Sequence, residues 1–170
     1  KGKKVMGVEL SDSGLKIFKK KMPDATFWKL DIEKKASKEK FDLGICSEVL
    51  EHIKYDFKAI KNLRKMCRQI IITVPAGKYG EDDKQMGHYR RYTIKDMNSK
   101  LEKAGFQVIK YEIWGFPFYS PIYRLFINNS SQKIRTGRFN ILKKIVSEFL
   151  YYLFFLNSSR KGDRLFILAK

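Results

Sequence analysis

Apolar runs rich in β-branched and aromatic residues alternate along this chain with segments whose apolar residues recur at helical spacing. The runs predict strands over residues 4–10, 25–32, 41–47, 69–75, 106–114 and 163–169. The segments between them predict helices over 11–22, 56–66 and 94–104. Regular alternation of strand and helix is typical of an α/β domain with a mostly parallel sheet.

Capping residues mark the ends of two of these helices. Ser11 or Asp12 can accept the free N–H groups that begin the first helix. Thr93 can do the same for the helix over 94–104, and Gly105 ends that helix. These signals place the helix boundaries independently of the apolar pattern.

Two stretches interrupt the alternation. Residues 76–92 form a long connection for a compact domain, and such connections commonly act as lids or binding segments. Residues 116–159 are rich in aromatic side chains and predict a helical insertion before the last strand. The length of 170 residues and a hydrophobic content of 44% fit a single domain over 1–170 that contains this insertion.

The second half of the insertion, residues 139–156, has an apolar stripe at helical spacing. The stripe consists of Leu142, Ile145, Val146, Phe149, Leu150, Leu153 and Phe154. Its uncharged part is shorter than the roughly 20 apolar residues that span a bilayer. We expect a helix packed on the domain's own core or on a partner subunit. The alternative is peripheral membrane contact, for which Lys143, Lys144, Arg160 and Lys161 would flank a lipid-facing helix.

A formal charge of +18 and a pI near 9.9 suggest RNA or an anionic membrane surface as a partner. Most of the excess is lysine, spread in small groups from Lys1 to Lys170, and this distribution equally fits a solvated surface. Cys46 and Cys67 lack the spacing of a disulfide framework or a zinc site, and no signal peptide opens the sequence. We therefore expect a cytoplasmic protein, with the inner face of the membrane as an alternative location.

Acidic residues follow the first two predicted strands. In an open parallel sheet the ligand lies beyond the carboxyl ends of the strands. Glu9 ends the first strand, where its carboxylate can accept hydrogen bonds from both hydroxyls of a ribose. Asp31 ends the second strand and can accept from an adenine amino group, while Ile32 can cover the ring. Together these residues predict a nucleotide-like ligand.

The stretch "CSEVLEH" follows the third strand and places Glu48, Glu51 and His52 at spacings of i, i+3 and i+4. On a helix this spacing would bring all three side chains to one face. Two carboxylates and an imidazole could hold a hard divalent ion such as Mg²⁺. The zinc-protease motifs do not apply, because they require two histidines.

In order along the chain, "VMGVELS", "LDI", "FDLGICSEVLEHI", "IIITVP", "GHYRRYT" and "EKAGFQVI" resemble the successive blocks of a class I S-adenosylmethionine-dependent methyltransferase. The resemblance implies a Rossmann-like α/β sheet, mostly parallel, whose antiparallel last strand "DRLFILAK" inserts beside the fifth. It also implies S-adenosylmethionine as the cofactor. Glu9, with Leu10 beside it, would bind the ribose. Asp31 and Ile32 would bind the adenine, and Cys46 and Ser47 would lie near the methionine part.

The sequence departs from this family at its beginning. Members start with a strand that ends in a glycine-rich loop, followed by a helix, and nothing here resembles that pair. The missing strand would lie between the strands of residues 5–9 and 43–47. We expect that the sequence is truncated at its N-terminus and lacks part of the cofactor site.

Two metal-dependent O-methyltransferase groups also carry an E-x-x-E-H run at this place: those of ubiquinone biosynthesis and those that methylate the 2′-oxygen at the end of small RNAs. The second group adds a histidine ahead of a threonine-initiated helix, and His88 falls there. The candidate metal ligands are therefore Glu48, Glu51, His52 and His88. In a metal-free enzyme His52 or His88 would be the general base, with Glu51 as a further candidate. Alternatively, these side chains only brace the helix start and the lid.

Three functions follow from this reading. The first is methyl transfer to a small or lipid-like acceptor, at oxygen, with the aromatic insertion building the acceptor pocket. The second is RNA 2′-O-methylation, for which RNA would be the partner. The third is a noncatalytic scaffold or membrane-surface module with a methyltransferase-like fold. Arg90 and Arg91 are expected to pair at the surface with the acidic residues of the lid, which are Glu81, Asp82 and Asp83; the alternative is that they bind an acidic substrate.

Overall fold

The computed structural model describes residues 3–128 and 140–170. Its strands are β1 (Met6–Glu9), β2 (Thr26–Lys29), β3 (Phe41–Ser47), β4 (Cys67–Pro75), β5 (Val108–Gly115) and β6 (Gly162–Ala169). Its helices are α1 (Asp12–Lys21), α2 (Asp56–Met66), α3 (Glu81–Gln85), α4 (Ile94–Lys103), α5 (Arg124–Asn128) and α7 (Ile141–Phe154). The short helical segments η1 (Leu50–His52) and η2 (Phe118–Tyr123) complete them. Residues 129–139 of the expected insertion lie outside the described residues.

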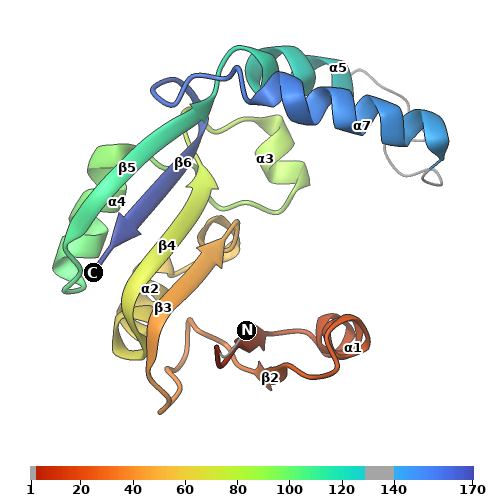
Figure 1. Cartoon of the computed structure of the whole chain (residues 1–170). Helices are drawn as coiled ribbons and strands as arrows, with labels where there is room; N and C mark the ends of the chain where they lie inside the picture. The colour runs from red at the N-terminus through yellow and green to blue at the C-terminus, as the bar shows by residue number, and fades with distance from the viewer. Residues whose placement is uncertain (1–2, 129–139) are drawn as a thin grey trace.

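The main sheet has four strands in the order β3-β4-β6-β5 (Figure 1). β3 and β4 are parallel, and β6 runs antiparallel to both of its neighbours. The expected α/β sheet with an antiparallel last strand beside the fifth strand is therefore confirmed. The helical segments between β5 and β6 occupy the predicted place of the insertion.

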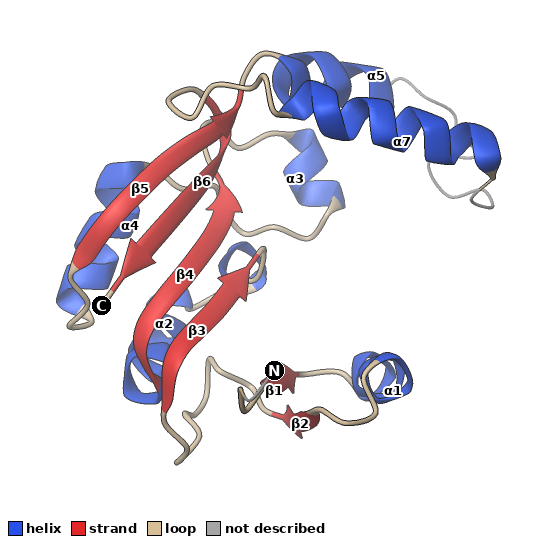
Figure 2. Cartoon of the chain, viewed as in Figure 1, coloured by secondary structure: helices blue, strands red, loops and turns tan. Residues whose placement is uncertain are grey.

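One face of this sheet carries the core. Alternate residues of the two central strands, Ile70, Ile72 and Val74 of β4 with Leu165 and Ile167 of β6, are buried there. Helices α2 and α4 cover this face, because their apolar stripes contribute Ala59, Ile60, Leu63, Met97 and Leu101 to the same cluster (Figure 2). The apolar residues that alternate along the strands and those that recur at helical spacing in α2 and α4 thus pack into one core.

The opposite face of the sheet is uncovered in the described part of the chain. Leu43 and Ile45 of β3 alternate with the buried Cys46, and both are exposed, Ile45 by 72%. Phe166 of β6 is exposed on the same side. The pattern of these strands, apolar on both sides, predicts a sheet covered on both faces.

The strands β1 and β2 form a separate parallel pair with α1 beside it (Figure 2). Ser11 caps α1 by accepting a hydrogen bond from the N–H of Gly14, as predicted. No residue of α1 is buried, although Phe18 stacks on Phe27 of β2 at 5.4 Å between ring centroids. In the described residues no strand lies between β1 and β3, where the family pattern has its glycine-loop strand.

The second predicted strand is shorter than expected. It was predicted to continue to residue 32 but ends at Lys29. The carboxylate of Asp31 accepts a hydrogen bond from the N–H of Glu33, and the backbone carbonyl of Asp31 accepts two more from Lys34 and Lys35. An aspartate that bonds to the backbone in this way favours a turn over an extended strand.

The stripe predicted for 139–156 does not pack as one face. Leu150, Leu153 and Phe154 are half-buried, whereas the first four residues of the stripe, Leu142, Ile145, Val146 and Phe149, are exposed. The expected packing on the domain's own core is therefore wrong for this part of the helix. Residue 139, at which the helix was expected to begin, lies outside the described residues.

A buried carboxylate ties α2 and α4 to the segment that precedes α4. Asp56, at the start of α2, accepts a hydrogen bond from Tyr92 Oη at 2.8 Å and pairs with Lys100 Nζ at 2.7 Å. Arg90 reaches the same carboxylate at 2.9 Å and donates to the carbonyls of Ile53 and Lys54. The expected pairing of Arg90 with the acids of the lid is therefore wrong, because Asp56 and two carbonyls hold its guanidinium.

We expect Asp56→Asn to lower the free energy of unfolding by about 3 kcal/mol at neutral pH, because it leaves two cations without their buried partner. Burial alone would raise the pKa of Asp56, but hydrogen bonds from Lys100 and Tyr92 outweigh it and lower the pKa from 3.8. The stabilisation is present above that value and is lost as the pH falls through the lower folded-state pKa.

Urea unfolding of both proteins across this pH range measures the effect. Asp96→Asn is the matched control, because Asp96 also pairs with Lys100 but is largely exposed, so its loss should cost less than about 1 kcal/mol. Equal losses from the two substitutions at neutral pH would contradict the prediction.

Candidate functional site

Residues 76–92, here called the lid, leave the end of β4 and return to it. The N–H of Tyr92 donates to the carbonyl of Pro75 at 2.9 Å, and the N–H of Gly77 donates to the carbonyl of Tyr92 at 3.3 Å. Between these closing bonds the lid forms α3, so it is an ordered segment and not an extended loop. A lid closed at its base in this way presents its side chains at a fixed place beyond β4.

Asp83 is the centre of the lid. Its carboxylate accepts hydrogen bonds from Nε of Arg91 at 2.7 Å, from the N–H of Gly80 at 2.8 Å and from Nδ1 of His88 at 2.9 Å. Burial alone would raise the pKa of Asp83, but these hydrogen bonds outweigh burial and lower it. The predicted pairing of Arg91 with an acid of the lid is confirmed, although the pair is buried and not at the surface.

Three of the four predicted metal ligands lie together. One carboxylate oxygen of Glu51 and one nitrogen each of His52 and His88 all lie within 4.8 Å of one another. The two imidazole rings meet edge to face, with centroids 4.6 Å apart. Glu51 and His88 are buried, whereas His52 is exposed. Because Asp83 is ionised and can only accept, it fixes a hydrogen on Nδ1 of His88 and leaves Nε2 available.

Glu48 does not join this group. The predicted helical face does not form, because Glu48 has a φ of +50° and only Leu50–His52 make a helical turn. The carboxylate of Glu48 instead accepts a hydrogen bond from Thr73 at 3.2 Å and pairs with Arg164 at 3.2 Å. The interpretation of Glu48, Glu51 and His52 as one face of a helix is therefore wrong.

The carboxylate of Glu51 has neither of its oxygens hydrogen-bonded in the described part of the chain, although the side chain is completely buried. Burial raises its pKa from 4.5 to about 7. Its backbone carbonyl, by contrast, accepts a hydrogen bond from the N–H of Tyr89 in the lid at 2.7 Å. The main chain of Glu51 thus braces the lid, and its side chain stays free for another partner.

The residues predicted to bind the ribose lie at the end of β1. Glu9 accepts hydrogen bonds from the N–H and the hydroxyl of Ser11 at 2.8 and 3.0 Å. The first of these bonds is the main reason that its pKa is lowered, so Glu9 is an anion at neutral pH. Leu10 follows it and is exposed.

The residues predicted to bind the adenine and the methionine part follow β2 and end β3. Asp31 lies in the turn after β2, and Ile32 packs against the core. Cys46 points into the core, where burial raises the pKa of its thiol to about 12. Only its backbone is therefore placed to meet a ligand. Ser47 is exposed, and its hydroxyl shares a hydrogen bond of 2.8 Å with Thr73.

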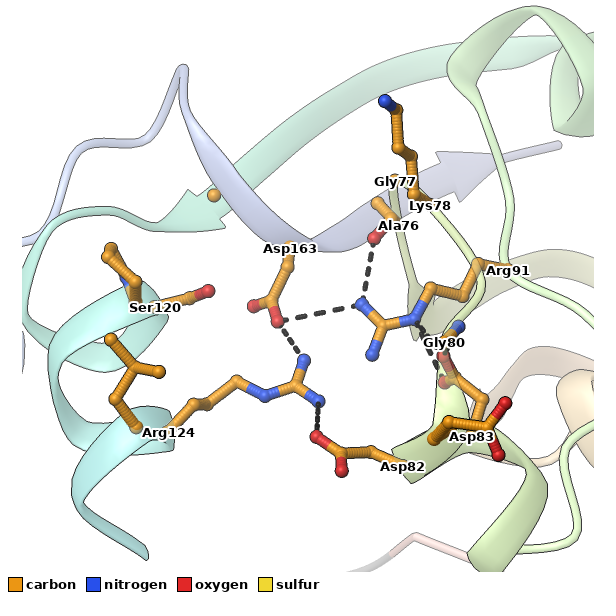
Figure 3. Close-up of a pocket in the computed structure, with 14 residues that line it drawn as sticks. Ala76, Gly77, Lys78, Gly80, Asp82, Asp83, Arg91, Ser120, Arg124 and Asp163 are labelled. Carbon is orange, nitrogen blue, oxygen red and sulfur yellow. Dashed lines mark hydrogen bonds and ion pairs between the residues drawn. The ribbon is translucent and has the colours of Figure 1, made fainter. Parts of the chain in front are cut away.

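A polar pocket of about 440 Å³ opens between the lid, the start of β6 and the η2–α5 segment (Figure 3). Arg91 and Arg124 approach Asp163 from opposite sides, and Arg124 also reaches Asp82 at 3.7 Å. One oxygen of Asp163, Oδ1, is buried without a hydrogen bond among the described residues. The pocket therefore offers fixed charges of both signs, and a buried carboxylate oxygen of Asp163 lies behind its wall.

The insertion contributes to this pocket through its polar and small residues. Ser120, Pro121, Arg124 and Leu125 line it. The aromatic side chains of the insertion pack on one another instead. Trp114, Tyr119, Tyr123 and Phe154 form this cluster, with ring centroids 5.2 to 6.1 Å apart. A smaller pocket of about 180 Å³ is lined by Glu112, Trp114 and Phe166. Aromatic side chains of the insertion do not line the larger pocket, and their expected role in binding the acceptor stays a prediction.

Comparison with known proteins adds the family context. Residues 1–70 match the family model described as a methyltransferase domain. Solved structures superpose on almost the whole chain, among them an S-adenosylmethionine-dependent methyltransferase from Archaeoglobus fulgidus. That comparison has a TM-score of 0.57 and 17% identity, and covers 97% of this chain and 75% of the other. The chain has the fold of the class I S-adenosylmethionine-dependent methyltransferases. The resemblance drawn from the sequence blocks is confirmed at this level.

Two further methyltransferase-fold structures show how far the likeness extends. Phosphoethanolamine N-methyltransferase 2 from Haemonchus contortus, in complex with S-adenosyl-L-methionine, has a TM-score of 0.58 and 19% identity, and the match covers 98% of this chain and 43% of that protein. The [4+2]-cyclase SpnF has a TM-score of 0.62 and 13% identity, with 98% and 66% covered. The chain thus spans less than two thirds of the length of both proteins. No curated protein matches the sequence.

Sequence reasoning missed the pocket residues Arg124 and Asp163. Arg124 is a single charged residue in an apolar run, whereas Asp163 lies among the basic residues Arg160, Lys161 and Arg164. The two residues are partners across a long stretch of sequence, so neither marks the other. Asp83 was noticed only as one of three lid acids, and its burial could not be read from the run "GEDD". The available signal was the presence of two arginines and a histidine within eight residues of it, since a buried carboxylate requires several donors.

We expect Glu51→Gln to raise the stability of the metal-free protein at pH 8 by up to about 3 kcal/mol. A raised folded-state pKa means that the contribution of Glu51 to stability is full below pH 4.5 and is lost as the pH rises through about 7. The variant lacks this loss because glutamine has no charge to bury.

Urea unfolding in the presence of a chelator, at several values between pH 5 and pH 8, measures the difference. Glu102→Gln is the control, because it removes a carboxylate from the exposed side of α4 and keeps Glu51 in place. A variant that is less stable than the parent throughout this range would show that Glu51 has a partner.

Proposed function

We propose that this chain is part of an S-adenosylmethionine-dependent methyltransferase that acts on a small or lipid-like acceptor, at oxygen. The observation that carries the proposal is the buried, unpartnered carboxylate of Glu51 next to His52 and His88, in a methyltransferase fold. Such a group can receive the proton that an acceptor hydroxyl loses when it is methylated. Residues 116–159 belong to the same proposed single domain and supply part of the acceptor pocket.

The cofactor would lie along the carboxyl ends of β1, β2 and β3. Glu9 is an anion whose hydrogen bonds within the described residues come from its neighbours Leu10 and Ser11, so its carboxylate can also accept from a ribose. Asp31 is held in a turn beside Ile32, in the order that the family uses for adenine. Backbone groups of Cys46 and the exposed Ser47 would meet the methionine part. The Haemonchus contortus enzyme, which shares the fold, was solved with S-adenosyl-L-methionine bound.

The acceptor would enter the polar pocket beyond β4. Asp163 Oδ1 requires a hydrogen-bond donor, and the guanidinium groups of Arg91 and Arg124 favour oxygen acceptors. Asp83 connects this pocket to the candidate base, because it lines the pocket and also holds His88. Asp83 and His88 thus link the pocket to the candidate base, and a polar acceptor fits the charges of the pocket.

The chemistry requires little from the protein beyond alignment and proton removal. S-adenosylmethionine, when bound, would supply the methyl group on its sulfonium, and transfer to the acceptor oxygen would release the neutral thioether S-adenosylhomocysteine. The hydroxyl proton passes to Glu51. A pKa of about 7 makes this carboxylate a suitable base near neutral pH. Asp83 orients His88 beside it.

A divalent metal ion is a second way to lower the pKa of the acceptor hydroxyl. The orphaned carboxylate of Glu51 and the nitrogens of His52 and His88 fit such an ion. Because Glu48 is turned away, the donor set is two imidazoles and one carboxylate, which suits Mn²⁺, Fe²⁺ or Zn²⁺ better than the predicted Mg²⁺. Asp83 would then support His88 from behind, as carboxylates commonly do for metal-bound histidines.

RNA 2′-O-methylation stays as the second candidate function. The observation in its favour is the juxtaposition of His88 with Glu51 and His52, because the small-RNA enzymes use this histidine. The charge of +18 is compatible with a polyanion. Binding to single-stranded RNA that weakens steeply with salt would support this candidate over a small acceptor.

We expect isothermal titration calorimetry to detect S-adenosylhomocysteine binding. Glu9→Gln or Asp31→Asn should weaken the binding about 10- to 100-fold, because each removes a charged hydrogen-bond acceptor. Glu112→Gln, within β5 and away from these strand ends, is the control and should leave affinity unchanged. Folded protein that binds no S-adenosylhomocysteine would support the scaffold alternative instead.

We expect Mn²⁺ to bind more tightly than Mg²⁺, as measured by the electron paramagnetic resonance signal of free Mn²⁺. His88→Gln or Glu51→Gln should weaken Mn²⁺ binding at least about tenfold, since each removes one of three ligands. Glu48→Gln is the control, because Glu48 faces Arg164 and not the group. Unchanged binding in the first two variants would leave Glu51 as a metal-free base.

A further inference from the structure

Helix α7 carries an outward apolar stripe. Ile141, Ile145, Phe149 and Tyr152 recur at i, i+4, i+8 and i+11, which places them on one line along the helix, and Leu142 lies beside this line. These five side chains are 57 to 73% exposed. Soluble proteins rarely leave so many large apolar side chains together in water, and such patches commonly mark interaction sites.

The stripe lies opposite the side by which α7 attaches to the rest of the protein. Phe154 packs on the rings of Tyr119 and Tyr123 of η2, at 5.5 and 5.4 Å between centroids. Phe154 and Leu150 are half-buried and lie about half a turn away from the line of Ile145. The helix is therefore anchored on its inner side, and its outer side is free to meet something else.

Basic residues flank the stripe. Lys144 lies in the first turns of α7 and is exposed, and the exposed Arg160 and Lys161 follow the end of the helix. Lys143, expected to join them, is half-buried and lies about half a turn from Ile145, so it does not flank the stripe. Glu148 is the only acidic residue between residues 140 and 162. The surface around the apolar stripe is thus positive, on a chain whose formal charge is +18.

We propose that α7 lies flat on an anionic lipid bilayer, with its apolar stripe among the acyl chains and its basic residues at the headgroups. The combination of an apolar face, flanking cations and exposed tyrosines is what interfacial helices use. Within the described residues, no helix is long and apolar enough to cross a bilayer, so the contact is peripheral. Among the alternatives stated for residues 139–156, this one accounts for the exposure of the stripe.

The charge around the stripe favours a membrane over a second copy of this chain as its binding partner. Docking two stripes together would bring two strongly positive surfaces into contact, which like-charge repulsion opposes. An anionic bilayer instead attracts the same basic residues and neutralises their charge. The surface chemistry of α7 therefore favours lipid over self-association.

The experiment is sedimentation of the protein with vesicles of phosphatidylcholine alone or of equal parts phosphatidylcholine and phosphatidylglycerol. We expect binding to the mixed vesicles only, weakened by added salt. The double substitution Ile145→Ser and Phe149→Ser should lower vesicle affinity at least about tenfold, because it removes two inserting side chains. Substitution of the exposed Ile109 and Tyr111 of β5 by serine is the matched control and should leave binding unchanged.

Two outcomes would overturn the proposal. One is binding to the mixed vesicles that is the same in the parent and in the α7 variant. The other is a parent that dimerises by light scattering and stays off the vesicles, while the α7 variant is monomeric. Because the stripe is exposed, the variant should unfold at the parent's temperature, and circular dichroism checks this. Binding of S-adenosylhomocysteine is measured separately, so the two proposals can fail independently.

Discussion

The carboxylate of Asp83 holds together the lid, the candidate base and the pocket. It is almost completely buried and accepts hydrogen bonds from Arg91, His88 and the backbone of Gly80. A buried charge is tolerated only when such partners surround it. Arg91 in turn donates to the carbonyl of Ala76, at the base of the lid. The position of His88 beside Glu51 therefore depends on one fully satisfied anion.

Glu51 is the counterpart of Asp83, and the role proposed for the site depends on the difference between these two carboxylates. Both carboxylates are buried. Hydrogen-bond donors lower the pKa of Asp83, whereas burial raises the pKa of Glu51 to about 7, because its oxygens have no hydrogen-bond donor among the described residues. Environments that shift the pKa values of two carboxylates in opposite directions give the two groups different roles. Asp83 positions its neighbours as a permanent anion, and Glu51 is the group that can exchange a proton or take a cation.

The sequence predicted what depends on local pattern and missed what depends on distant partners. Strand β3 and helix α2 were placed to the residue, because their periodicity and boundaries lie within the elements themselves. The helical face expected for Glu48 failed, since a positive φ at that residue turns the chain before η1 begins. Asp163 and Arg124 meet across 39 residues, and no local signal marks such a pair. The roles of Glu9, Asp31, Ile32, Cys46 and Ser47 in cofactor binding stay predictions, because the structure gives only their positions at or after the strand ends.

The proposed acceptor pocket and the proposed membrane contact of α7 together imply one class of acceptor. The pocket is lined by charges, yet Arg124 and Leu125 belong to α5, which directly follows the η2 segment on which α7 packs (Figure 1). A bilayer in contact with α7 would therefore lie close to the insertion residues that line the pocket. A wholly polar acceptor would gain nothing from this placement, and a wholly apolar one would leave Asp163 Oδ1 without a donor. An amphipathic acceptor, with a polar end in the pocket and an apolar part toward the membrane, satisfies both surfaces.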